Sequence, residues 1–194
     1  GGIWHSGALT AEGEAYCWGD SWGATPEVIG HGLGTGSTTP VAVAGGHAFV
    51  TIDANQWHNC ALTTSGEAYC WGMGESGRLG NGGSSHRDVP TAVVGGHRFV
   101  AIAAGLSHSC GLTAGGSAYC WGSNQEYQLG ASGITGSNTP VEVELPGQRL
   151  LAISAGENHT CALNSSGEAY CWGVGASGQL GDGLGDVGED PPHT

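Results

Sequence analysis

One phrase recurs four times along this chain and constrains its fold more than any other feature. The phrase is EAYCWG or SAYCWG, and its tryptophans are Trp18, Trp71, Trp121 and Trp172. A second phrase precedes each copy at the same spacing: HSGAL from His5, HNCAL from His58, HSCGL from His108 and HTCAL from His159. A period of about 50 residues predicts a repeat architecture, in which each unit buries its apolar faces against its neighbours.

Each copy contains four short runs that are typical of β-strands. In the third copy they are 99–105, 107–113, 117–122 and 140–145. A glycine-containing turn predicts a tight hairpin between the second and third runs, and a glycine-rich loop follows the third. We expect the fourth strand of each copy to start at its proline, which is Pro40, Pro90, Pro140 or Pro191. No segment shows a sustained helical period, so the sequence predicts an all-β fold.

Four-stranded units of this length indicate the blades of a β-propeller. The succession H-x-C-A-L, A-Y-C-W-G, G-Q-L-G-D-G, P-V-x-V and F-V-x-I-x-A-G resembles the regulator of chromosome condensation repeat family. The cysteine-bearing version resembles a bacterial, often secreted, branch of that family. The resemblance implies a propeller, and the usual ring of the family has seven blades. We therefore expect one repeat domain, 1–194, with blades near 1–44, 45–94, 95–145 and 146–194.

The repeat count departs from the usual ring. Four blades, with one inner and one outer strand missing, make only a partial propeller. Three explanations stay open: a fragment of a longer array, chains that assemble to close or extend the array, and a small self-closed ring. An open arc would expose edge strands and apolar blade faces.

Six of the seven cysteines form pairs that lie ten residues apart and symmetrically about a hairpin turn. The pairs are Cys60 with Cys70, Cys110 with Cys120, and Cys161 with Cys171. Such positions face each other in an antiparallel ladder, so we expect three disulfides and an oxidising compartment. Cys17 is left unpaired, because Gly7 occupies the matching position.

The alternative for these cysteines is a zinc or copper site that includes a histidine, such as His58 with Cys60 and Cys70. A histidine also opens the first copy, where the first cysteine is absent. That pattern favours a structural histidine bonded to neighbouring backbone, and we predict no metal.

The charge of the chain excludes some partner classes. Seventeen acidic residues stand against four arginines and no lysine, which gives a formal charge of −13. Nucleic acid and anionic membranes need a basic surface, so both are poor partners. No stretch approaches the roughly 18 apolar residues of a membrane span.

Four aromatic residues outside the repeated phrases are candidate contacts for a ligand or partner: Trp4, Trp22, Trp57 and Tyr127. Trp4 and Trp57 precede the histidine phrase, and the other two lie in the loops after Trp-Gly. Exposed rings at a propeller rim can stack on a sugar or anchor a protein. Packing between blades is the alternative for each of them.

No nucleophile elbow, metalloprotease motif or catalytic pair of carboxylates is present in the sequence. We expect a non-catalytic extracellular module, without a cofactor, that recognises a protein or a glycan. A structural subunit of a self-assembling extracellular filament is the alternative. The resemblance also implies guanine-nucleotide exchange, which the missing basic surface and the cysteines disfavour.

Overall fold

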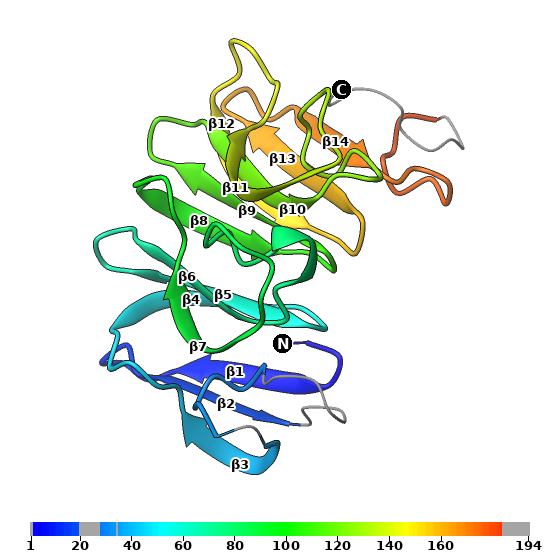
Figure 1. Cartoon of the computed structure of the whole chain (residues 1–194). Helices are drawn as coiled ribbons and strands as arrows, with labels where there is room; N and C mark the ends of the chain where they lie inside the picture. The colour runs from blue at the N-terminus through cyan, green and yellow to red at the C-terminus, as the bar shows by residue number, and fades with distance from the viewer. Residues whose placement is uncertain (1, 20–27, 34, 184–194) are drawn as a thin grey trace.

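The computed structural model describes residues 2–19, 28–33 and 35–183, and it confirms the all-β prediction. Four antiparallel sheets, here called blades 1 to 4, follow one another along the chain and fan out (Figure 1). Blade 1 contains β1 (His5–Leu9), β2 (Ala15–Gly19) and β3 (Ser37–Ala42). Blade 2 contains β4 (Phe49–Ala54), β5 (His58–Thr63), β6 (Ala68–Gly72) and β7 (Arg87–Ala92).

The second half of the chain repeats this arrangement. Blade 3 contains β8 (Phe99–Ala104), β9 (His108–Thr113), β10 (Ala118–Ser123) and β11 (Gly136–Glu142). Blade 4 contains β12 (Leu150–Ala155), β13 (His159–Asn164) and β14 (Ala169–Gly173). One turn of 3-10 helix, η1 (Glu75–Gly77), follows β6. In the described ranges no helix is long and apolar enough to cross a membrane.

The strands of each blade form a meander, in which consecutive strands are hydrogen-bonded neighbours. The first strands of successive blades also contact one another, β4 with β8 and β8 with β12. In a fan of sheets, this contact places the first strands along the common axis. Blades 1 and 4 have three strands each within the described residues.

A glycine sets the turn of each central hairpin. In blade 2 the Gly66 N–H donates to the carbonyl of Thr63, and Gly66 has a φ of 79°, which a glycine adopts without steric cost. A Cβ at Gly66 would lie 2.8 Å from the carbonyl oxygen of Phe99 in blade 3. The glycine therefore serves both the turn and the close approach of the next blade.

The prediction that the fourth strand starts at the proline is wrong. Pro40, Pro90 and Pro140 lie inside β3, β7 and β11, while Pro191 falls outside the described residues. In blade 2 the register shifts between Cys70, which faces Thr91, and Gly72, which faces Arg87. The proline is tolerated because it lies in this irregularity on an edge strand, where no ladder N–H is needed.

Apolar side chains are buried mainly between neighbouring blades. The cluster between blades 2 and 3 joins Leu62, Leu79 and the Cys60–Cys70 pair to Phe99 and Trp121. Trp71, Trp121 and Trp172 are at most 1% exposed, and each packs in the cluster shared with the preceding blade. Each blade therefore depends on its neighbour for the burial of its largest side chain, as a repeat architecture requires.

Candidate functional site

Three disulfides cross-link the central hairpins of blades 2, 3 and 4. They join Cys60 to Cys70, Cys110 to Cys120, and Cys161 to Cys171, with Cα–Cα distances of 4.2, 4.0 and 4.1 Å. Each pair is directly opposed in the ladder, and these separations fit the closer kind of antiparallel pair. Cys17 is a buried free cysteine opposite Gly7, and burial raises the pKa of its thiol to about 12. A protonated, enclosed thiol of this kind is a poor nucleophile.

A chain of buried hydrogen bonds, here called the interblade relay, joins each blade to the next. Between blades 2 and 3, His58 Nε2 lies 2.7 Å from Ser109 Oγ. The Ser109 hydroxyl donates to the carbonyl of Arg78 at 2.9 Å, and Trp121 Nε1 donates to the same carbonyl at 2.9 Å. One loop carbonyl of blade 2 is thus held by two side chains of blade 3.

The same relay is present at the other two blade junctions. Between blades 1 and 2 it contains His5, Asn59, Trp71 and the carbonyl of Val28. Between blades 3 and 4 it contains His108, Thr160, Trp172 and the carbonyl of Gln128. The recurrent histidine therefore bonds a side chain of the next blade, and the expected bond to neighbouring backbone is wrong for these three.

The relay fixes the protonation of its histidines. The Ser109 proton is committed to the Arg78 carbonyl, so His58 must donate its Nε2–H, and the amide oxygen of Asn59 imposes the same tautomer on His5. Burial lowers the pKa of His58 well below its usual value, with Arg78 and neighbouring histidines adding to the effect. Burial likewise lowers the pKa of His108 to about 3. These imidazoles are neutral structural donors at physiological pH.

The metal alternative requires thiolates and histidine nitrogens that the structure uses elsewhere. Cys60 and Cys70 form a disulfide, and His58 Nε2 is engaged in the relay. Within the described part of the chain, no group of three or more His, Cys, Asp or Glu side chains is arranged to hold a metal ion.

Three of the candidate aromatic contacts, Trp4, Trp57 and Tyr127, lie toward one end of the blades. We call this end the loop rim: it carries residues 55–57 and 105–107 and the loops that follow β6, β10 and β14. Trp57 belongs to it, because its carbonyl accepts the N–H of Met73, directly after β6. Trp4 is 43% exposed, Trp57 is partly buried, and Trp22 falls outside the described residues. Their role as contacts stays a prediction.

Tyr127 on the loop rim has an unusual backbone conformation. Its φ is 58° and its side chain is 40% exposed. Glycine occupies the equivalent position in two other blades, as Gly77 with φ 81° and Gly178 with φ 75°. An L-residue in the left-handed region costs roughly 1–2 kcal/mol. The chain therefore accepts strain at a position that presents an aromatic ring to solvent.

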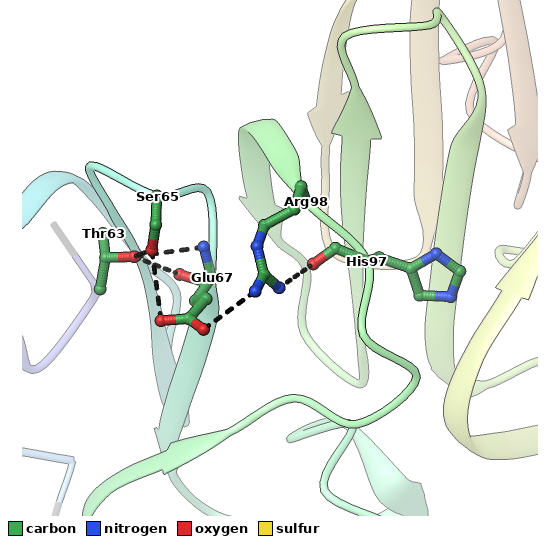
Figure 2. A network of polar contacts seen from close by, with 5 residues as sticks. All are labelled: Thr63, Ser65, Glu67, His97 and Arg98. Carbon is green, nitrogen blue, oxygen red and sulfur yellow. Dashed lines mark hydrogen bonds and ion pairs between the residues drawn. The ribbon is translucent and has the colours of Figure 1, made fainter.

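The opposite end of the blades, here called the hairpin rim, carries a polar network between blades 2 and 3 (Figure 2). Arg98 Nη2 lies 3.2 Å from Glu67 Oε1, and the Ser65 hydroxyl donates to the other oxygen of Glu67. The His97 ring lies against the ring of Tyr119, with 4.1 Å between the ring centroids and a tilt of 36° between the two planes. A hollow of about 270 Å³ lies between Glu67, Tyr69, Val93 and Phe99, among others.

The network on the hairpin rim is structural in character. The side chains of Arg98 and Glu67 are 57% and 44% exposed, and an ion pair in such a position contributes little stability, about 0–1 kcal/mol. The ion pair connects the turn between β5 and β6 of blade 2 to the segment that leads into β8 of blade 3.

Sequence reasoning missed the partners in the relay. A signal was present, because the residue after each repeat histidine is small and polar in all four copies: Ser6, Asn59, Ser109 and Thr160. That pattern alone does not reveal which carbonyl accepts the hydrogen bond, nor that the histidine of one blade bonds the polar side chain of the next blade.

Comparison with known families identifies the repeat. The profile described as the regulator of chromosome condensation (RCC1) repeat matches residues 65–112 and 115–163. A second profile of the same description matches residues 49–78, 99–128 and 151–179. The matched segments cover most of blades 2 to 4.

Two relatives illustrate the range of proteins that contain such a segment. The human E3 ubiquitin-protein ligase HERC2 is 32% identical over 185 residues, which cover 92% of this chain and 3% of HERC2. The ultraviolet-B receptor UVR8 of Arabidopsis thaliana is 36% identical over 191 residues, which cover 96% of this chain and 31% of UVR8. The chain thus spans less than a third of either relative.

Solved structures share the arrangement of the blades. Human WBSCR16 superposes with a TM-score of 0.83 at 24% identity, over 99% of this chain and 50% of that one. Yeast RCC1 (Prp20), solved bound to Kap60, gives a TM-score of 0.80 at 22% identity, over 98% of this chain and 46% of the other. The likeness extends to the fold, which is that of RCC1-type propeller blades.

Proposed function

The chain belongs to the regulator of chromosome condensation (RCC1) repeat family, and from that premise we propose that it is a non-catalytic, extracellular protein-recognition module. Propellers of this family are protein-interaction modules, and the yeast RCC1 neighbour was solved in complex with a protein partner. The loop rim is the surface that we assign to recognition here. The observation that carries this assignment is the strained, exposed Tyr127.

The difference between the regular blades, here called the frame, and the loops that they carry supports the assignment of partner recognition to the loop rim. The frame repeats the same disulfide, relay and buried tryptophan, so it holds the loops on a rigid support. Binding residues are commonly found on loops that a rigid scaffold positions. Local backbone strain also concentrates at functional sites. Tyr127 satisfies both criteria, and Trp57 lies on the same rim.

The disulfides support an extracellular location. Six cysteines of the chain are oxidised in pairs, and such bonds persist in oxidising compartments and are rare in the cytosol. Each disulfide closes a short loop. In the chain-entropy account, this closure raises the free energy of unfolding by roughly 2.5–3 kcal/mol. A chain that depends on these bonds for its stability is suited to a secreted environment.

Affinity capture with single-residue variants tests the recognition proposal. The immobilised chain is exposed to solubilised cell-surface proteins, and the bound species are quantified by mass spectrometry. We expect Tyr127→Gly and Trp57→Ala each to reduce the captured protein at least tenfold, in the range of a hot-spot residue. Tyr127→Gly relieves backbone strain, so a loss of binding cannot be attributed to unfolding.

Val100→Ala is the control, because Val100 is 60% exposed on β8 and does not belong to the loop rim. Equal capture by all four proteins, or capture of nothing, would refute the assignment of the loop rim. Binding on a glycan array that disappears in Tyr127→Gly would identify a sugar as the ligand in place of a protein.

A further inference from the structure

One buried side chain organises the loop that connects β10 to β11. We call this loop, residues 124–135, the blade 3 loop. Asn124 begins it and is only 3% exposed. Its Nδ2 donates to the carbonyls of Ala131 and Ile134 at 2.8 and 2.9 Å. Its Oδ1 accepts the N–H of Leu129 at 2.9 Å. Both N–H groups and the oxygen of the side-chain amide are therefore engaged inside the loop itself.

The backbone of Asn124 closes the same loop. Its N–H donates to the carbonyl of Thr135 at 2.9 Å, and its carbonyl accepts the N–H of Tyr127 at 3.2 Å. The Tyr127 carbonyl in turn accepts the N–H of Gly130 at 3.0 Å. The three side-chain bonds and two backbone bonds of Asn124 thus tie both ends of the loop to the segment that carries the strained, exposed ring.

Blades 2 and 4 have no asparagine at the equivalent position, three residues after the repeat tryptophan. Glycine stands there, as Gly74 and Gly175. A Cβ at Gly74 would overlap the carbonyl oxygen of Ser85. The Gly74 N–H donates to His86 Nδ1 at 3.0 Å, whereas the Asn124 N–H donates to a backbone carbonyl. The loops of blades 2 and 3 are therefore closed by different contacts, and the fold of a blade does not require this asparagine.

The blade 3 loop presents two apolar side chains to solvent. Tyr127 is 40% exposed and Ile134 is 37% exposed. Blade 2 has Gly77 and Ser84 at these positions, because Arg87 and Ser137 face equivalent glycines in the two sheets. Both exposed residues are bonded directly to Asn124, Tyr127 through its N–H and Ile134 through its carbonyl. One polar residue therefore fixes the backbone of both.

We propose that Asn124 is a positioning residue, which holds Tyr127 and Ile134 as one contact surface for a protein partner that presents apolar side chains. The inference rests on the proposed function, because it concerns the same rim. A loop that is already ordered loses little conformational entropy when the partner binds, so its affinity is higher than that of a loop that the partner must order. Without the Asn124 side chain, the partner has to order the loop.

Hydrogen exchange of the free chain, followed by NMR, tests the positioning without a partner. Asn124→Gly introduces the residue of blades 2 and 4, so the sheets should stay folded. The Leu129 amide loses its acceptor and should exchange about tenfold faster, as expected for one lost hydrogen bond. The Val143 amide, which donates to the carbonyl of Ala118, should be unchanged. Gln125→Gly is the matched control, because it adds a glycine next to Asn124 but removes only an exposed side chain.

A double-mutant cycle tests whether Asn124 acts through the exposed residues. The probe is the protein that the wild-type chain captures in the largest amount from solubilised cell-surface proteins, and its dissociation constant is measured for each variant. Asn124→Gly and Ile134→Ser should each weaken binding about tenfold. In the Tyr127→Gly background, the effect of Asn124→Gly should shrink to about threefold or less, because only Ile134 remains to be positioned. In the Trp57→Ala background it should keep its full size, because Trp57 belongs to blade 2.

The results separate this inference from the proposed function. Equal exchange of the Leu129 amide in the wild type and Asn124→Gly would overturn the inference. An effect of Asn124→Gly on binding that is the same with and without Tyr127 would also overturn it, because that result indicates a general structural role. If nothing is captured, or if Tyr127→Gly binds as tightly as the wild type, the proposed function and the inference fall together. If Tyr127→Gly weakens binding and Asn124→Gly does not, only the inference falls.

Discussion

The buried histidines of the interblade relay predict a specific dependence of stability on pH. The perturbation is His108→Gln, which keeps an N–H donor for Thr160 but removes the titrating ring. His108 is fully buried, and burial, assisted by nearby His159, lowers its pKa from 6.5 to about 3. The folded state therefore binds a proton at this site only near pH 3, whereas the unfolded chain binds one below about pH 6.5.

The sign follows from linkage. Between those two pKa values the unfolded state binds more protons, so the free energy of unfolding falls as the pH falls below 6.5 and levels off near pH 3. Each pH unit in that window is worth about 1.4 kcal/mol for one group. Between pH 6.5 and pH 5, the titration of His108 alone should therefore lower the free energy of unfolding of the wild-type chain by about 2 kcal/mol.

Urea unfolding with the disulfides intact, at pH 7.5, 6.5 and 5, provides the assay. On acidification from pH 7.5 to pH 5, the free energy of unfolding should fall by about 2 kcal/mol less for His108→Gln than for the wild type. This difference does not depend on the stability of the variant at pH 7.5. Comparison of the two proteins cancels the contribution of the carboxylates. Ile102→Val is the control: it costs roughly 0.5–1.5 kcal/mol at every pH without changing the slope. Identical pH slopes for wild type and His108→Gln would refute the relay as described.

The remaining predictions concern single residues whose equivalents in other blades indicate the expected result. A Cβ at Gly7 would lie 3.3 Å from Cys17 Sγ, so Gly7→Cys should form a fourth disulfide. It should raise the free energy of unfolding by ~2.5–3 kcal/mol and reduce the free-thiol count from one to none. Ser109→Ala leaves the His58 donor buried without a partner and should cost about 1–3 kcal/mol in urea unfolding, while Ser65→Ala on the exposed turn should be near neutral. Tyr127→Gly should leave the melting temperature unchanged or raise it, and a clear drop would remove the evidence for strain at this residue.

The parts of the fold that depend on local pattern could be predicted from the sequence. The hairpins and their disulfides follow from cysteines placed symmetrically about a glycine turn, as Cys110 and Cys120 show. The start of the fourth strand could not be predicted, because it depends on a register shift opposite Trp121 that lets residues before Pro140 pair with β10. Proline marks an irregular segment of that strand and not its first residue.

The candidate site divides in the same way. The aromatic candidates were recognisable as rings outside the repeated phrases. The strain at Tyr127 could also have been inferred by placing it against Gly77 and Gly178, since glycine in two copies indicates a left-handed backbone. The pairing of Arg98 with Glu67 could not be inferred, because it depends on how closely two blades approach at the hairpin rim.

The oxidation state of the protein in its native compartment tests the central claim most directly. The chain is isolated in the presence of an alkylating agent, denatured without a reductant, and its modified cysteines are counted by mass spectrometry. Blades stapled by disulfides outside the cell predict a single alkylated residue, Cys17. Alkylation of all seven cysteines would contradict both the staples and the extracellular role.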